Sequence, residues 1–373
     1  MGRTIMSKLV PAGAALLALS AGGALAATSN STVTQTAGTV GVSATVNQSG
    51  VKGSTSTVLQ NGGSNGATAS VTQSDTGPTG TAAALANTST VTQTGATGAG
   101  PASSVVVNQA KTVNGAKNGS TVTQDTVVST GATVLQAGAH NTSTVNQVRQ
   151  KNSAAYVSQI GDGAAENTVD IEQAPAFGVA EDTFASAVQN GHDLHSLINQ
   201  VGTTPAAHGN IAWSNQTGSS DYSEIQQSGL AGYANVTQAG TNHDSQVTQS
   251  NLRNSATVSQ TGDLNTSTVT QTGQYGSAGV TQSGQLQVST VTQSGTNNTA
   301  NVFQSNEWNT SLVTQRGGFG SAGVTQTGED NKSTINQQIT STYAQAVVLQ
   351  SSDDNKSTIV QAGAGDFASI TQN

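Results

Sequence analysis

Two kinds of position alternate strictly along short segments of the chain, and each segment ends on a glutamine. The alternate residues of segment 265–271 are Asn, Ser, Val and Gln, and those of segment 276–282 are Gly, Ala, Val and Gln. A period of two is typical of a β-strand with one special face. The residues between segments, such as 272–275, include the glycine that a tight chain reversal favours. The pattern therefore predicts one strand and one turn per segment.

The glutamines form a regular series. From residue 216 to residue 337 they recur at a constant spacing of eleven, and the position four before each glutamine alternates between Ala and Ser. The repeat is therefore 22 residues, or two strands, one of Ser type and one of Ala type. We expect the glutamines and the valines two positions before them to point inward. The predicted ladder glutamines are Gln216, Gln227, Gln238, Gln249, Gln260, Gln271, Gln282, Gln293, Gln304, Gln315, Gln326 and Gln337, and the predicted core valines are Val269, Val280, Val291, Val302, Val313 and Val324.

Earlier in the chain the same strands recur at wider spacing. The extra residues at 76–81, 98–101, 175–179 and 203–208 contain Gly or Pro, so they are expected to lengthen turns without removing a strand. Counting back to Gln35 gives 28 strands, or about 14 rungs. The predicted organisation is a signal peptide at 1–26, irregular repeats at 27–215 and regular 11- and 22-residue repeats at 216–373.

Stacking of such repeats predicts an all-β, two-strand-per-rung β-solenoid of the cross-β kind. In-register rungs place identical side chains about 4.8 Å apart, and each backbone group pairs with the rung above or below. The two strands of a rung cross the core in opposite directions, so a large Val faces a small Ser or Ala. Gln and Asn amides at the edges of the core are expected to bond to their copies one rung away.

The composition favours a stacked β-solenoid over a conventional hydrophobic core. Only 8% of the residues are charged and 3% are aromatic, which is too little for an ordinary globular enzyme. The net charge is −8 and the chain has no cysteine. Disulfides and thiol chemistry are thus excluded, and the lack of a basic patch argues against nucleic acid as a partner.

The N-terminus has the pattern of a secretory signal. Arg3 and Lys8 precede an apolar stretch, and small residues end at Ala24, Leu25 and Ala26, which fits an A-x-A cleavage site. The apolar stretch is short and interrupted by Pro and Gly, which disfavours a membrane anchor. No later segment is apolar enough to span a membrane. We therefore expect export and cleavage after Ala26.

Units such as 298–304, preceded by the turn 294–297 and alternating with Ser-bearing units, resemble curlin repeats. These are the Gln-x-Gly-x-x-Asn-x-Ala-x-x-x-Gln building blocks of bacterial curli subunits, and the resemblance extends over residues 29–372. It implies a secreted subunit that polymerises into extracellular functional amyloid, the curli pilus, for adhesion and biofilm matrix. The implied partners are further copies of the chain, other curli-type subunits and export accessory proteins.

Few residues suggest catalysis or metal binding. His192 and His195 have a spacing that two metal ligands can share, but no third ligand is evident, and a structural role is favoured. The acidic turns at 329–331 and 353–355 could share calcium, although solvated turns that slow aggregation are favoured. Trp213 is expected to point outward and Trp308 to lie in a turn. We predict no enzyme, no cofactor and no catalytic residues.

Two other functions were weighed against the fibre subunit. Rows such as Thr266, Thr268 and Thr270 would suit an ice-binding face, but the next Ser-type strand has Val288 in the first position. A monomeric carbohydrate-binding or carbohydrate-cleaving solenoid at the cell surface would need caps, and neither end of the repeat shows one. The repeat begins on a Ser-type strand and closes on an Ala-type strand, so we expect head-to-tail polymerisation without a phase error.

Overall fold

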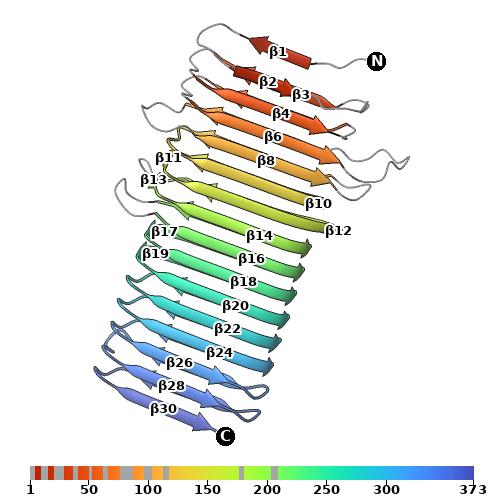
Figure 1. Ribbon diagram of the computed structural model, residues 1–373. Coiled ribbons are helices and arrows are strands. Elements are labelled where there is room, and N and C mark those ends of the chain that lie inside the picture. Colours follow the sequence, from red (N-terminus) through yellow and green to blue (C-terminus); the bar gives the residue numbers. More distant parts are fainter. Residues whose placement is uncertain are drawn as a thin grey trace. The chain divides into compact units, whose positions relative to one another are not determined.

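The fold is all-β, as the alternation predicts. The computed structural model describes residues 5–9, 16–20, 29–36, 41–49, 53–61, 66–75, 87–95, 103–111, 117–175, 180–202 and 209–373, and these residues contain no helix. They form two compact units, one ending at Leu194 and the other beginning at His195. In each unit the strands stack in chain order as a parallel β-solenoid with two strands per turn (Figure 1). The predicted fold class is therefore confirmed.

The first unit contains fourteen strands among its described residues. They are β1 (Ile5–Leu9), β2 (Leu16–Ser20), β3 (Asn30–Gln35), β4 (Ser43–Ser49), β5 (Thr55–Gln60), β6 (Thr68–Asp75), β7 (Thr88–Thr94), β8 (Ser104–Lys111), β9 (Gly119–Asp125), β10 (Gly131–Val148), β11 (Gln150–Lys151), β12 (Ala154–Gln173), β13 (Ala180–Glu181) and β14 (Phe184–His192).

The second unit contains sixteen strands among its described residues. They are β15 (His195–Val201), β16 (Ile211–Ser219), β17 (Tyr222–Leu230), β18 (Tyr233–Thr241), β19 (Asp244–Leu252), β20 (Ser255–Asp263), β21 (Thr266–Gln271), β22 (Ser277–Gln285), β23 (Val288–Gln293), β24 (Thr299–Glu307), β25 (Thr310–Gln315), β26 (Ser321–Gln326), β27 (Lys332–Gln337), β28 (Gln345–Gln350), β29 (Lys356–Gln361) and β30 (Phe367–Gln372).

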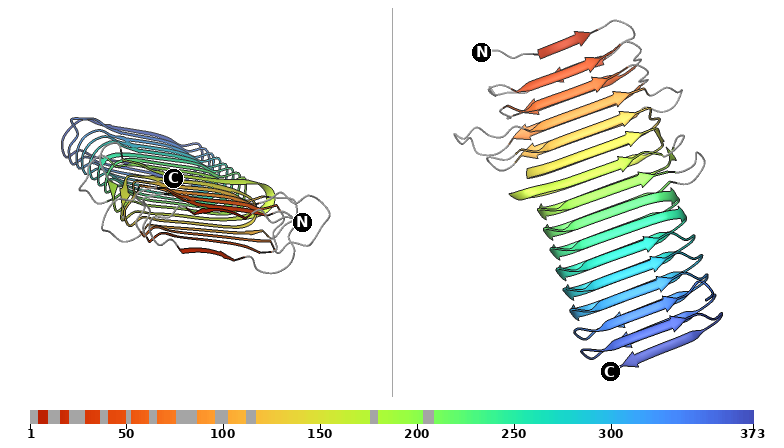
Figure 2. Two further views of the ribbon diagram at one scale, coloured as in Figure 1. Left: turned by 90° about the horizontal axis from the view of Figure 1, so that it is seen from above. Right: turned by 180° about the vertical axis from the view of Figure 1, so that it is seen from behind.

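Most strands pair in parallel with the strand two places along the chain, so odd and even strands form separate layers. β10 is an exception, because its first half pairs with β8 and its second half with β9, so it belongs to both layers. In the second unit β21 pairs with β23, which sets Gln271 beside Gln293, and β22 pairs with β24, which sets Gln282 beside Gln304. The views from above and from behind show the two layers within each unit (Figure 2). Ser-type strands stack only on Ser-type strands and Ala-type strands on Ala-type strands. The 22-residue repeat is the spacing between such neighbours.

Burial follows the predicted face. In β21 the buried residues are Ser267, Val269 and Gln271, while the residues between them are partly exposed. The six valines named above are between 0% and 3% exposed. The core is therefore a thin layer of Val, Ser and Ala bordered by fully buried amides.

Turns reuse the same backbone conformation from rung to rung. Non-glycine residues with φ near +55°, among them Leu264, Leu286 and Trp308, occupy successive corners 22 residues apart. Glycine is required at some corners by crowding. A Cβ on Gly284, whose φ is +139°, would lie 1.9 Å from the backbone oxygen of Asn306 in the next rung. Such an approach is possible only without a side chain.

Three features were not foreseen in the sequence. β1 and β2 lie within the segment predicted as a signal peptide and pair with β3 and β4, while cleavage stays a prediction. β10 and β12 each continue through a corner where a turn between two strands was expected. The boundary between the units lies near residue 195, whereas the spacing becomes regular at residue 216, so the domain division also stays a prediction. Of the extra segments, 76–81, 98–101 and 203–208, with most of 175–179, lie outside the described residues.

Candidate functional site: the stacked polar columns

The buried glutamines form a continuous column of hydrogen bonds within each layer. Gln271 donates from Nε2 to Oε1 of Gln293, 2.8 Å away, and Gln293 donates in the same way to Gln315 over 2.7 Å. In the other layer Gln260 donates to Gln282 and Gln282 to Gln304, each over 2.9 Å. The first unit repeats the arrangement. Every glutamine named in the sequence analysis lies in one of the two columns.

The second N–H of each amide bonds across the rung. Gln271 donates it to the backbone oxygen of Ser255 over 3.0 Å, and Gln282 donates it to that of Thr266 over 3.0 Å. Both donors of each amide are thus used and the oxygen accepts from the rung before. Since an unpaired buried amide costs several kcal/mol, this pairing allows a polar group at zero exposure.

The serines four positions before the glutamines differ from the glutamines in their hydrogen bonding. The hydroxyls of Ser245, Ser267, Ser289 and Ser311 are buried, and the structure gives them no hydrogen-bond partner. The equivalent residues of the other layer, such as Ala278, have no polar group to satisfy. The Ser/Ala alternation therefore distinguishes the two layers by size and polarity without adding a hydrogen bond.

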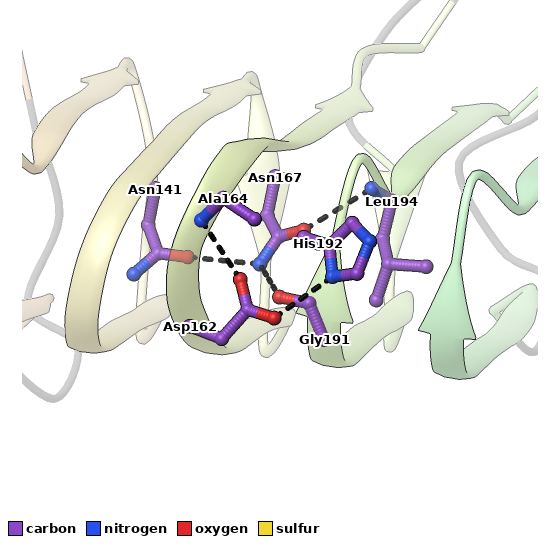
Figure 3. A network of polar contacts seen from close by, with 7 residues as sticks. All are labelled: Asn141, Asp162, Ala164, Asn167, Gly191, His192 and Leu194. Atoms are coloured by element: carbon purple, nitrogen blue, oxygen red, sulfur yellow. Dashed lines mark hydrogen bonds and ion pairs between the residues drawn. The ribbon is translucent and has the colours of Figure 1, made fainter.

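A second polar column stands six positions before the glutamines, where the strand leaves a turn. In the first unit Asn167 donates to Oδ1 of Asn141 over 3.2 Å and to the backbone oxygen of Gly191 over 2.8 Å (Figure 3). Its own Oδ1 accepts the backbone N–H of Leu194 over 3.1 Å. The amide thus closes the corner of the next rung, which explains why Asn is frequent at this position.

One exposed ion pair stands beside this column. Oδ2 of Asp162 lies 2.8 Å from Nδ1 of His192, and Oδ1 accepts the backbone N–H of Ala164 over 2.9 Å (Figure 3). The bond from Ala164 lowers the pKa of Asp162 most, burial acts against it, and His192 lowers it further. The sequence analysis named His192 but not its partner, because the two residues lie 30 positions apart with irregular spacing between them.

The histidine motif and the acidic turns show no metal geometry. His195 begins β15 with an exposed side chain. Among the described residues no group of three or more His, Asp or Glu side chains could hold a metal ion. In the acidic turns the backbone N–H of Glu329 donates to Oδ1 of Asp353 over 2.9 Å. One carboxylate of this pair of turns therefore supports the neighbouring backbone.

The outward faces differ between the units. Thr57, Thr90 and Thr121 stand in register three positions before their glutamines, with Thr32 and Thr144 at either end of the row. The same column in the second unit reads Glu224, Gln246, Thr268, Thr290 and Leu312. Trp213 points outward and Trp308 lies at a corner, 42% and 50% exposed.

Two ionisable residues occupy the column that otherwise holds amides. Asp221 precedes β17 and His243 precedes β19, and both are fully buried. The backbone N–H of His243 donates to Oδ1 of Asp221 over 2.9 Å, while Oδ2 of Asp221 has no hydrogen-bond partner. The sequence analysis missed both residues. Their place six positions before a ladder glutamine, where Asn is usual, was the available signal.

Comparison with known proteins gives one family match. Residues 253–284 match the family model described as the curlin associated repeat. A comparison with curated proteins gave no match. A search of the described residues found no helix of the length and apolar character needed to cross a membrane.

Proposed function

We propose that the chain, whose residues 253–284 match the curlin associated repeat, is a secreted structural subunit that assembles into curli-like amyloid fibres outside the bacterial cell. The fibres would serve adhesion and the biofilm matrix. The chain would act as a structural protein, since the buried groups that recur from rung to rung are hydrogen-bonded amides. Its main partner would be a second copy of itself.

The observation that carries this proposal is the in-register parallel stacking of like strands, which continues to the last described rung. β29 pairs with β27 and β30 pairs with β28, and β30 is the last strand of its layer in the second unit (Figure 1). The inward residues Ala368, Ile370 and Gln372 are partly exposed, whereas their counterparts in β28 are buried. An open strand edge of this kind is a template for a further strand.

The hydrogen bonds at this edge fit a second copy in register. Gln372 accepts from Gln350 over 2.8 Å and donates one N–H to the backbone oxygen of Lys356 over 3.3 Å. Its second N–H is the donor that a further ladder glutamine would receive. In an incoming chain β4 offers Ala44, Val46 and Gln48 in the same order.

Removal of the N-terminal segment is part of the proposal. β1 and β2 pair with β3 and β4, so the first Ser-type and Ala-type strands are covered while residues 1–26 are present. Cleavage after Ala26 would expose both strands. We therefore expect the cleaved chain to present β3 and β4 for pairing with a further copy.

Seeded growth tests the proposal. Chain cleaved after Ala26 should form fibres under the electron microscope, increase the fluorescence of amyloid dyes and give the cross-β reflection near ~4.7 Å. Ile370→Lys places a charge on the inward side of the open edge and should block elongation. Ser369→Lys, on the exposed side of the same strand, is the matched control and should elongate. Cleaved chain that stays monomeric by light scattering for days, with dye fluorescence unchanged, would refute self-assembly.

The threonine row of the first unit favours one second candidate, an ice-binding monomer. Five in-register threonines on a flat layer provide regularly spaced hydroxyl and methyl groups. Thermal hysteresis of a dilute solution distinguishes the two functions, because an ice-binding face depresses freezing without any assembly. The absence of thermal hysteresis would remove this candidate and leave the fibre proposal intact.

A further inference from the structure

Three residues in the column of Asn-type positions in the odd layer of the second unit, Asn265, Gln287 and Asn309, follow one rule for the bonds that they donate. Asn265 donates from Nδ2 to the backbone oxygens of Thr261 and Gly284, each over 3.0 Å, and its Oδ1 accepts the N–H of Gln287 over 3.0 Å. The donated bonds reach residues four positions before and nineteen positions after. The accepted bond comes from the residue 22 positions after. Two donors and one acceptor of Asn265 therefore meet fixed backbone groups at this corner.

Other members of the column obey the same rule despite their different chemistry. Asn309 donates to the oxygens of Ser305 and Gly328 over 2.6 and 2.8 Å. Gln287 donates to those of Ser283 and Asn306 over 3.2 and 2.9 Å. In these three residues the position therefore supplies a donor, whereas Nδ2 of Asn331 in the same column has no hydrogen-bond partner.

As a neutral imidazole, His243 supplies both a donor and an acceptor at this position. Nε2 lies 3.4 Å from the backbone oxygen of Ala239, four positions before, and Nδ1 lies 3.4 Å from the backbone nitrogen of Asn265. Since the N–H of Asn265 can only donate, Nδ1 must accept and the proton must be on Nε2. Burial lowers the pKa of His243, with the bond to Ala239 acting against it.

An ionised Asp221 supplies the acceptor of this pattern but cannot supply the donor. Its Oδ1 accepts from His243 as the rule requires. Oδ2 has no partner. In Asn265 the donated bonds go to the backbone oxygens four positions before and nineteen after, and the corresponding residues for Asp221 are Thr217 and Gly240. A carboxylate oxygen facing two carbonyl oxygens is repelled, whereas a carboxylic acid O–H donates to them.

We propose that Asp221 is held in the folded stack as a neutral carboxylic acid whose Oδ2–H takes the place of the amide donor, and that loss of this proton loosens the corner between β16 and β19. Asp221 and His243 then form a pH-responsive element within the stack. This inference concerns the folded chain and does not depend on fibre assembly.

The surroundings of Asp221 also favour its neutral form. Burial raises the pKa of Asp221 to about 7, although the bond from His243 lowers it. Gln216 and Gln238 of the facing layer bring no charge, and His243 is the titratable neighbour within the column. The other titratable groups nearby are His195 on β15, Tyr222 and Glu224 on β17, Tyr233 on β18, Asp244 on β19 and Asp263 at the end of β20.

The two groups make the stack respond to pH in opposite senses. The pKa of Asp221 is higher in the folded chain than the ordinary value of 3.8, so its contribution is complete below pH 3.8 and is lost as pH rises through about 7. The pKa of His243 is lower than its ordinary value of 6.5, so its contribution is present above pH 6.5 and is lost as pH falls through the folded value. Asp221 therefore accounts for loosening on the alkaline side.

The test uses the full chain and a local readout. Hydrogen exchange of the His243 backbone N–H reports opening of the corner after correction for the intrinsic effect of pH. Between about pH 4 and 7 the opening equilibrium should rise by up to about tenfold per pH unit and then level off. Asp221→Asn supplies a permanent donor and should abolish this rise. Asp330→Asn, the same replacement at an exposed turn, should behave as the parent chain.

A second measurement follows the titration in the parent chain and uses the variant only to assign the resonance. Carbon-13 NMR of the aspartate carboxyls should show one group that titrates near neutral pH and is missing in Asp221→Asn. A carboxyl of Asp221 that titrates near 3.8, or an unchanged rise of opening in Asp221→Asn, would overturn the proposal. Repeating the titration with calcium tests whether a metal replaces the proton. An ionised Asp221 stabilised by calcium would also overturn it.

Discussion

Gln271 and Gln293 lie in successive rungs of one layer, and the Nε2 of the first donates to the Oε1 of the second over 2.8 Å. The amide of Gln271 also bonds to the backbone of the facing layer, at Ser255. One side chain therefore joins two rungs and two layers. Because the same bonds recur at each rung, the column ties the thin core together along its border.

Replacing Gln271 by Glu tests the need for both donors. A carboxylate accepts but does not donate, so it would face the oxygens of Gln293 and Ser255 while fully buried. We expect a loss of about 3 kcal/mol or more in the free energy of unfolding, measured by chemical denaturation. Gln246→Glu on the exposed side of β19 is the matched control. Equal losses at the two sites would contradict a role for the buried column.

Enlarging the small inward position should separate the layers. Ala278→Leu adds volume where Ala278 is 4% exposed, and we expect a cost of about 1–3 kcal/mol. Thr270→Lys changes an outward position and should shift the free energy of unfolding by less than about 0.5 kcal/mol. Denaturant titrations of the two variants beside the parent chain measure both. A silent Ala278→Leu would mean that the core has room to spare.

The unpartnered serine hydroxyls lead to a less usual expectation. Ser267→Ala removes a fully buried hydroxyl that makes no hydrogen bond and leaves the residue that the other layer uses. The variant should be neutral or more stable by about 1 kcal/mol in thermal or chemical unfolding. A loss of stability above about 1 kcal/mol would indicate that the hydroxyl has a partner.

Two glycines allow a matched test of backbone crowding. A Cβ at Gly284 would meet the backbone oxygen of Asn306 at 1.9 Å, whereas a Cβ at Gly323 would meet nothing within 4 Å. Gly284→Ala should disrupt the corner and cost more than about 2 kcal/mol. Gly323→Ala should stabilise the chain by up to about 1 kcal/mol, because alanine reduces the freedom of the unfolded state. Measured together by chemical denaturation, the free energy of unfolding should fall in Gly284→Ala and rise in Gly323→Ala.

The exposed pair of Asp162 and His192 predicts a small effect at acid pH. The backbone N–H of Ala164 and the His192 side chain lower the pKa of Asp162 below its ordinary value of 3.8. The stabilisation is therefore present above pH 3.8 and is lost as pH falls through the lower folded value. The amide resonance of Ala164 should follow this titration by NMR, with a midpoint below 3.8. Asp162→Asn should remove the titration and keep the resonance in place.

The sequence by itself determined the strands and the face that each presents. Side chains alternate across a strand by local geometry, so Val269 and Gln271 can be placed on one face without knowledge of any distant residue. The alternation of Ser267 with Ala278 gave the two-strand period for the same reason. The inserted residues at 161–166 could not be placed in this way, and β12 continues through them where a turn was expected.

Only the tertiary structure decided which polar groups meet. Gln271 bonds to residues 22 and 16 positions away, and Asp162 meets a histidine 30 positions away, across turns of unequal length. The environment of Asp221 is decided in the same way, since a carboxyl is ordinary in an exposed turn and exceptional where it is fully buried with one oxygen unpartnered. Strand direction and face follow from local backbone sterics, whereas hydrogen-bond partners and pKa values depend on stacking register and burial, which arise only when the rungs close on one another.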